Sequence, residues 1–432
     1  MSNALNGAWF APADDVEVEE TPQVKTAYNL PALKVGSPLA RALYSVWSQQ
    51  PVTIVKSPPG AGKTTLITQL ATQLFLRSDM TIGVLTPTNS SGSDLVRRLV
   101  EELGQDEDGT TRVASTSSRI SNVDGASQVG GFSPIRRVEV STVASMLART
   151  RGRYDGSETD FDLLIIDEAY QCTFSDIARA CDFADQILLV GDPGQIGPVV
   201  TINTAPFEGN ERAPHIPAPV VFERDGGAEI IHLESTFRLG QTTVEAIGCL
   251  YDFEFDSLRV ERTVKDKDGN ERKEIESVLV QPNPVRSDLA TMDTLVDRAQ
   301  SFIGGVVTTT ENGQQVEEEI RTEDVAIIVS HVDQTQTVRA LLDARGMFLT
   351  QVGTADSLQG SQWKCVVALD PLFGHAEAGH HSIHSGRLCV MASRHMAHLS
   401  WVHDGQSEQK LKNIKSADAI KGRKVRKALT KH

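Results

Sequence analysis

The sequence predicts an α/β protein built on parallel β-sheets. Apolar, β-branched runs at 52–55 and 82–85 each lead through a polar loop into a helical pattern. Two further apolar runs, at 163–166 and 187–190, are typical of strands covered by helices on both faces. Because loops at the carboxyl ends of parallel strands meet at one edge of the sheet, functional residues are expected there.

The 432 residues are enough for two or three domains, and 40% of them are hydrophobic. The composition predicts an acidic flexible arm over 1–35, a first domain over 36–205 and a second domain over 206–405. A polar surface insertion is expected at 101–135, a charged hairpin at about 256–285, and a basic tail at 406–432.

A glycine-rich loop joins the strand at 52–55 to a helical pattern. It consists of Ser57, Pro58, Pro59, Gly60, Ala61, Gly62, Lys63, Thr64 and Thr65. In such a loop the glycines turn backbone N–H groups toward phosphate oxygens, the lysine reaches the β- and γ-phosphates, and the following hydroxyl ligates Mg²⁺. Ser57 stands where the general pattern has glycine. The loop predicts a nucleotide site.

Two carboxylates follow the buried run at 163–166. In a phosphate-loop enzyme Asp167 would hold Mg²⁺ and Glu168 would polarise the attacking water. An acidic pair at the start of a helix is the alternative. The run at 187–190 ends in a polar loop whose amide, Gln195, could sense the γ-phosphate.

The ordered segments Gly-Lys-Thr at 62–64, Asp-Glu-Ala at 167–169 and Gly-Asp-Pro-Gly-Gln at 191–195 resemble the first RecA-like domain of superfamily 1 helicases. Segments at 233–238, 323–329, 354–360 and 387–394 are similar to motifs of the second RecA-like domain in that superfamily. The loop prolines and the segment at 191–198 most resemble the up-frameshift and RecD-type branch. That branch moves 5′ to 3′ on single strands.

The resemblance implies two tandem RecA-like P-loop NTPase domains and a role for each matching residue. Lys63 and Thr64 would bind ATP and Mg²⁺, Asp167 would bind Mg²⁺, Glu168 would be the base, and Gln195 the sensor. Nucleotide contact is also expected at Gly360, and arginine fingers at Arg238 and Arg394. Nucleic-acid contacts are expected at Thr86, Pro87, Thr88, Ser141, Thr142, Thr354 and Trp363.

Three positions qualify these roles. Ala40 stands where the family carries a glutamine that reads adenine, which predicts weak base selectivity. Gln362 replaces a glutamate that can bind the ribose, although an amide still accepts a hydrogen bond. Trp363 either stacks on a base or fills the core at the start of a strand.

Charge restricts how a nucleic acid could bind. The net charge of −15 excludes a uniformly basic surface, so a strand must follow a locally basic track. Candidate tracks are Arg97 and Arg98, Arg136 and Arg137, the group Arg149, Arg151 and Arg153, and the tail from Lys410 to His432. Each could equally be a solvated face.

Other features indicate the setting of the protein. No apolar run approaches the ~20 residues that span a bilayer, and the polar start does not resemble a signal peptide, so a cytoplasmic protein without membrane contact is expected. Five scattered cysteines favour reduced thiols. A monomer is expected, with single-stranded DNA or RNA as its partner and DNA favoured.

The sequence therefore predicts an ATP-dependent helicase or translocase moving on single-stranded nucleic acid. One alternative is a nucleic-acid-stimulated NTPase that remodels protein–nucleic-acid complexes without separating strands. The other is a nucleotide-gated binding module with negligible turnover, although such a module would need neither a base nor two arginines.

Overall fold

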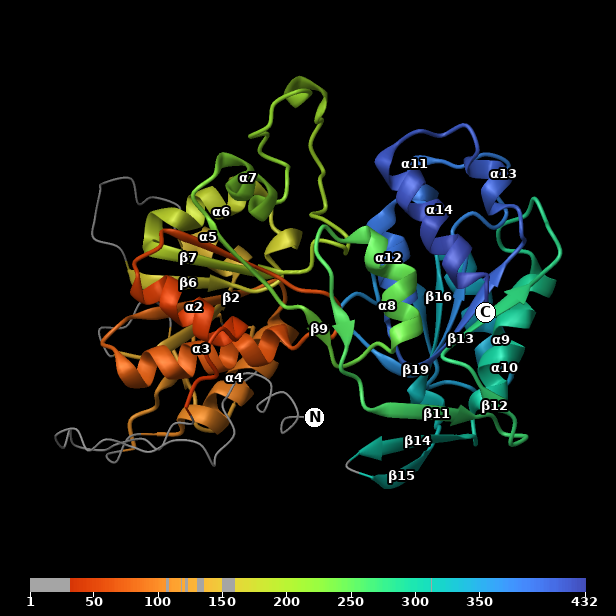
Figure 1. Cartoon of the computed structure of the whole chain (residues 1–432), viewed down its shortest axis with the longest axis horizontal. Coiled ribbons are helices and arrows are strands. Elements are labelled where there is room, and N and C mark those ends of the chain that lie inside the picture. The colour runs from red at the N-terminus through yellow and green to blue at the C-terminus, as the bar shows by residue number, and fades with distance from the viewer. Residues whose placement is uncertain are drawn as a thin grey trace. The chain divides into compact units, whose positions relative to one another are not determined.

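The computed structural model describes residues 32–105, 109–117, 119–120, 123–129, 136–149, 160–311 and 313–432. Nearly all of the predicted acidic arm, part of the predicted insertion, and Arg151 and Arg153 lie outside these residues, as does the side chain of Arg149. The contacts divide the chain into two compact units (Figure 1). The first contains residues 1–57, 62–193 and 197–233, and the second contains 58–61, 194–196 and 234–432.

The first unit is built on an eight-stranded sheet with the strand order β4-β3-β5-β2-β6-β7-β1-β8. All seven neighbouring pairs are parallel, which confirms the predicted fold class. The strands are β1 (Val52–Lys56), β2 (Ile82–Thr86), β3 (Val113–Ser115), β4 (Ser127–Gln128), β5 (Val138–Thr142), β6 (Phe161–Ile166), β7 (Ala184–Gly191) and β8 (Glu229–His232).

Helices cover both faces of this sheet. They are α2 (Pro38–Trp47), α3 (Lys63–Arg77), α4 (Asn89–Leu103), α5 (Val143–Arg149), α6 (Phe174–Ala180) and α7 (Ala218–Asp225), with short 3₁₀ turns at Ala169–Gln171, Cys181–Phe183 and Ala205–Phe207. Figure 1 shows α5, α6 and α7 on the face opposite α3 and α4. Ile54, Leu164 and Ile166 pack toward Ile177 of α6 and Ala218 of α7.

The second unit contains a parallel five-stranded sheet with the order β13-β19-β18-β16-β17. These strands are β13 (Ile275–Leu279), β16 (Val325–Val329), β17 (Gln351–Thr354), β18 (Trp363–Leu369) and β19 (His395–His403). A separate antiparallel sheet has the order β12-β11-β14-β15, formed by β11 (Glu261–Lys265), β12 (Glu271–Arg272), β14 (Val306–Glu311) and β15 (Gln314–Glu319). The short strands β9 (Ser235–Thr236) and β10 (Asp256–Ser257) pair with each other.

Two apolar layers sandwich the five-stranded sheet. Its helices are α8 (Gln241–Ile247), α9 (Leu289–Phe302), α10 (Val332–Ala344), α11 (His380–Ile383), α12 (Ser385–Ser393), α13 (Ser407–Leu411) and α14 (Ala417–Leu429), with 3₁₀ turns at Gly248–Leu250 and Thr322–Asp324. Side chains of α8, α12 and α14 pack on one face, and those of α9 and α10 pack on the other (Figure 1). Alternate residues of β16 point to opposite faces, as its pleat requires.

The segments differ from the sequence prediction in four places. The first unit extends past 205 to Leu233, because β8 pairs with β1 and completes its sheet. The predicted insertion contributes β3, which is buried and pairs with β5, so it is not only a surface segment. Only β11 and β12 form the expected charged hairpin, because β13 joins the parallel sheet. The basic tail forms α13 and α14 within the second unit.

Among the helices of the described residues, none has the length and apolar character needed to cross a membrane.

Candidate nucleotide site

The glycine loop adopts the backbone conformation that its sequence predicts. Its first residue, Ser57, is fully buried and donates its N–H to the carbonyl of Gly191 at 3.0 Å, which ties the loop to the end of β7. Gly60 and Gly62 have φ angles of 73° and 89°, which side chains with a Cβ disfavour. Helix α3 begins at Lys63, so its N-terminal N–H groups face the loop, as anion binding at a helix terminus requires.

The acidic pair lies beside this loop. Lys63 Nζ is 3.2 Å from Glu168 Oε1, and the N–H of Glu168 donates to Asp167 Oδ1 at 2.9 Å. Glu168 has a left-handed φ of 52°, a conformation that costs of order 1–3 kcal/mol in a residue other than glycine. A strained backbone beside the half-buried Lys63 indicates a functional position. Glu168 does precede the 3₁₀ turn at Ala169–Gln171, as the helix-start alternative expects, but its side chain caps no N–H of that turn.

Electrostatics link four charged groups of the site. Burial and, next to it, the neighbouring charge of Glu168 together raise the pKa of Asp167 to about 7, against the opposing charge of Lys63. For Lys63, burial opposes the charged form, but Glu168, Asp192 and Asp167 together raise its pKa. Asp192 is 1% exposed and was absent from the predicted site. Its place in the loop after β7 was the available signal.

The residues present fit a magnesium ion. The Thr64 hydroxyl and the Asp167 carboxylate are hard oxygen donors, which Mg²⁺ prefers, and a cation would relieve the repulsion that raises the Asp167 pKa. Within the described ranges, no group of three or more acidic, histidine or cysteine side chains could hold a metal alone. The ion would therefore complete its shell with phosphate oxygens and water.

The two predicted arginines converge on one residue of the second unit. Arg238 NH1 donates to the carbonyl of Ser393 at 3.5 Å, and Arg394 NH2 donates to the Ser393 hydroxyl at 3.3 Å. Arg394 is 2% exposed and also donates to the carbonyl of Ser361 at 3.4 Å. Ser393 thus contacts both guanidinium groups and keeps them close together. The sequence prediction did not include Ser393.

The second unit also includes the loop tip at 58–61 and the residues at 194–196. The N–H of Phe237 donates to the Gly60 carbonyl at 3.0 Å, and a Cβ on Gly60 would lie 2.3 Å from Arg238 Cβ. Gln359 Nε2 donates to Gln195 Oε1 at 3.3 Å. The predicted sensor therefore lies next to the segment at 354–360, and the loop tip lies next to Arg238.

A buried polar network lies behind Arg394. Its neighbour His395 is fully buried, and His395 Nε2 lies 2.9 Å from Thr243 Oγ1. Thr243 Oγ1 donates to Glu274 Oε1 at 2.5 Å, and Arg259 lies 3.7 Å from the other oxygen of Glu274. Burial lowers the pKa of His395, which keeps it neutral. This network fixes the junction between α12 and β19.

The predicted nucleic-acid residues divide by exposure. Thr88 is exposed and Pro87 is half-buried at the start of α4, and Thr354 is half-buried at the end of β17. The side chains of Thr86, Ser141 and Thr142 are buried, so they are not available to a strand. Thr142 instead accepts the N–H of Ser145 and caps α5. Their burial counts against direct side-chain contact, and the roles of these three residues stay predictions.

The structure bears differently on two predicted contacts in and next to the segment at 354–360. Trp363 is 9% exposed and packs in the core with Leu358 and Val366, so the core interpretation holds and base stacking does not. Gly360 is exposed in a turn with φ of 86°, with open space around it. Its role as a nucleotide contact stays a prediction.

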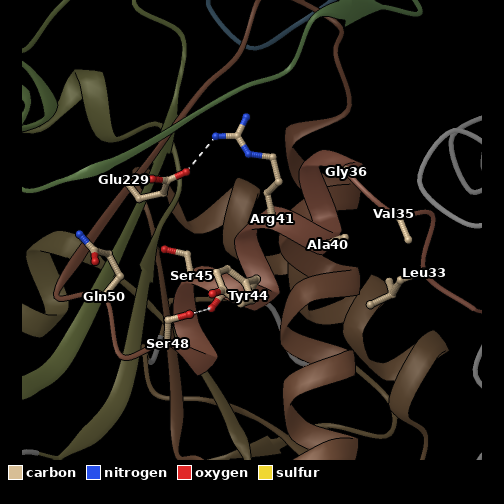
Figure 2. A pocket seen from close by; sticks show the side chains of 10 residues that line it. All are labelled: Leu33, Val35, Gly36, Ala40, Arg41, Tyr44, Ser45, Ser48, Gln50 and Glu229. Atoms are coloured by element: carbon tan, nitrogen blue, oxygen red, sulfur yellow. Dashed lines mark hydrogen bonds and ion pairs between the residues drawn. The ribbon is translucent and has the colours of Figure 1, made fainter.

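Ala40 lines a cavity of ≈ 440 Å³ beside α2 and β8 (Figure 2). Its methyl group offers no hydrogen bond, and the polar neighbours have partners of their own. Arg41 pairs with Glu229 at 2.8 Å, and Ser48 donates to the Tyr44 carbonyl at 2.6 Å, as the dashed lines in Figure 2 show. A glutamine, Gln50, does line the same wall, but its Nε2 donates to the Gly227 carbonyl, and Ala40 itself offers no amide at the position of the missing glutamine.

The parallel sheet, the glycine loop and the acidic pair at its edge define a P-loop NTPase with a RecA-like α/β fold. Residues 40–209 match the family described as an AAA domain. No curated protein matches the chain.

Several solved structures resemble it at low identity. The PRRSV helicase is 15% identical with a TM-score of 0.43, over 88% of this chain and 61% of its own. Arterivirus nonstructural protein 10, described as a helicase, is 16% identical in a complex with DNA, with a TM-score of 0.46 over 87% of this chain and 66% of its own. A crystal structure of that arterivirus protein is 15% identical, with a TM-score of 0.45 over 87% and 64%. The chain thus spans less than two thirds of their lengths.

Proposed function

We propose that this protein is a superfamily 1 motor of the up-frameshift and RecD-type branch, which hydrolyses ATP with Mg²⁺ while moving 5′ to 3′ on single-stranded DNA. The observation that carries the proposal is the Lys63–Glu168 pair at 3.2 Å, next to a buried Asp167 and a loop built to hold phosphate. The AAA-domain match over 40–209 covers this site and supports nucleotide use.

In this mechanism each side chain has one task. Lys63 binds the β- and γ-phosphates, and Thr64 and Asp167 would hold a magnesium ion, which would neutralise phosphate charge. Glu168 accepts a proton from the attacking water, and the contact with Lys63 at 3.2 Å holds its carboxylate beside the phosphate loop. Gln195 senses the γ-phosphate.

Arg238 and Arg394 supply positive charge to the transferring phosphoryl group. Because both belong to the second unit and share Ser393, they would act together rather than one at a time. Hydrolysis would then depend on these arginines reaching the phosphates, a step that could couple hydrolysis to movement on the strand.

Glu168→Gln tests the assignment of the base. The amide cannot accept the proton, so ATP hydrolysis should fall by about 100-fold or more while ATP binding persists. Glu101→Gln, an exposed residue of α4, serves as the matched control and should hydrolyse ATP at the wild-type rate. Hydrolysis by Glu168→Gln at the wild-type rate would overturn the assignment.

Polarity and strand choice require separate assays. Displacement of streptavidin from biotin at the 3′ end of a single strand, but not at the 5′ end, is expected for 5′ to 3′ movement. Faster displacement on DNA than on matched RNA supports the DNA preference. Streptavidin release from the 5′ end alone would refute the polarity, and equal rates would refute the preference.

Ala40 leads to a further expectation about the nucleotide. With no amide to read the base, GTP should support hydrolysis within a few-fold of ATP at equal Mg²⁺, and Ala40→Gln should shift the preference toward ATP. A strong preference of the wild-type protein for ATP would contradict this expectation.

A further inference from the structure

The C-terminal helix α14 has two faces with different functions. Its inner face carries Val425 and Leu429, both fully buried in the core of the second unit. Arg426 is 1% exposed and donates from Nε to the two carboxylate oxygens of Asp370 at 2.9 and 3.1 Å. The helix is therefore a fixed part of this unit rather than a loose tail.

The outer face is a row of cations. Arg423, Lys424 and Lys427 lie within an arc of roughly 100° around the helix, opposite the buried residues, and Lys431 follows just beyond its end. Lys424, Lys427 and Lys431 are exposed, and Arg423 is half-buried. We call these four side chains the α14 basic face.

Nearby carboxylates do not neutralise this face. Asp370 pairs with Arg426, Asp404 pairs with Lys410 at 2.7 Å, and Asp418 accepts the Ser385 hydroxyl. Across the described ranges, none of the four cations of the α14 basic face forms a salt bridge. In a chain of net charge −15, this is a concentrated site of uncompensated positive charge.

We propose that the α14 basic face binds the phosphates of a single-stranded nucleic acid, as a contact additional to the motif residues of the motor. Charge complementarity supports this occupant, because several unpaired cations gathered on one face of a fixed helix attract a polyanion. A membrane surface fits less well, because a membrane-binding helix inserts an apolar face and the apolar face of α14 is buried in the protein. This inference rests on the proposed function for the identity of the strand.

The test compares two triple variants with the same change in charge. Lys424→Gln, Lys427→Gln and Lys431→Gln remove three cations of the α14 basic face. Lys265→Gln, Lys267→Gln and Lys273→Gln remove three exposed lysines in and next to the hairpin of the same unit, which lies among acidic residues. Truncation of the tail is unsuitable, because it would strip Val425 and Leu429 from the core.

Fluorescence anisotropy with a labelled single-stranded DNA across a salt series gives the readout. The α14 variant should bind about tenfold more weakly at low salt, and its log–log salt slope should fall by about 2, because each lost phosphate contact removes about 0.7. The hairpin variant should match the wild type. Unchanged melting temperature and ATPase rate without DNA would show that both variants fold.

Each outcome decides the inference. Wild-type affinity and slope in the α14 variant, or equal losses in both variants, would overturn it. Loss of binding to polyglutamate but not to DNA would assign the face to an acidic protein and also overturn it. If the α14 variant shows the expected loss but DNA does not stimulate the wild-type ATPase, the motor function alone fails. If DNA stimulates the wild-type ATPase but the α14 variant binds DNA as tightly as the wild type, only the inference about the α14 basic face fails.

Discussion

The two parallel sheets place their functional residues in different ways. In the first unit, the proposed phosphate and metal ligands follow the carboxyl ends of β1, β6 and β7, within about eight residues of each strand. In the second unit, Arg238 and Arg394 are held by Ser393 and backed by the Glu274–His395 network, whose members come from distant segments. The first site is thus set by local sequence, and the second by tertiary contacts.

The largest effect should come from the local site. Lys63→Met removes the cation that meets the phosphates and leaves Glu168 and Asp167 without their counter-charge. Both ATP binding and hydrolysis should be lost, with a fall in rate of about 1,000-fold or more. Equilibrium binding of a fluorescent ATP analogue measures ATP binding, and the rate of phosphate release measures hydrolysis. Lys265→Met, an exposed control, should leave both unchanged.

Substitutions of the two arginines should distinguish the contribution of the second unit, to hydrolysis, from that of the first unit, to ATP binding. Arg394→Lys and Arg238→Lys keep the charge but lose the planar fork, so hydrolysis should fall by about 100-fold or more while ATP binding changes little. The double variant should be scarcely worse than either single one, because both arginines act through Ser393. Additive losses would argue against a shared unit. Arg321→Lys is the exposed control.

A third change tests the network itself. Glu274→Ala leaves Arg259 buried without its carboxylate and removes the acceptor of Thr243, which should reduce the free energy of unfolding by about 3–5 kcal/mol. Urea denaturation measures this loss. Glu271→Ala, an exposed neighbour, should cost less than about 0.5 kcal/mol. Equal stability of the two variants would show that tertiary contacts do not hold this site.

The smallest effect concerns the hairpin turn. Burial opposes the charge of Asp266, but hydrogen bonds from Arg272 and Asn270 hold its pKa at about 2. The ionised carboxylate therefore stabilises the fold above about pH 4, and this stability is lost as the pH falls toward 2. Asp266→Asn should lower the free energy of unfolding by about 1–3 kcal/mol at pH 7. The variant should also lose less stability than the wild type between pH 4 and 2. A pH series of urea melts checks this, with Asp268→Asn as control.

The same contrast explains what could be predicted from the sequence. The strands, the loop and the acidic pair were predictable, because an apolar run followed by Gly-Lys-Thr or Asp-Glu fixes the local geometry. Asp192 was missed although it directly follows β7, because the burial of a loop carboxylate is set by tertiary packing. Ser393 and His395 flank Arg394 in the sequence, but only tertiary packing brings Arg238 to Ser393 and Glu274 to His395, so these contacts were missed.

The predicted boundaries of the domains and of the tail were wrong for a similar reason. The pairing of β8 with β1 joins residues about 176 positions apart, as Thr53 pairs with Glu229, and no local pattern reports it. The tail was predicted to be only a charged segment because its apolar residues, Leu411, Ile414, Ile420, Val425 and Leu429, are interspersed among many lysines and arginines. Trp363 was ambiguous because a tryptophan at a strand start can face either core or solvent, and only the core packing decides.

One measurement tests the central claim most directly: the rate of ATP hydrolysis as single-stranded DNA is added. A motor whose arginines are brought to the phosphates when the strand binds should show a saturable increase in rate, and Arg394→Lys should remove that increase. A wild-type rate that does not change with single-stranded DNA or RNA at any concentration would contradict the account.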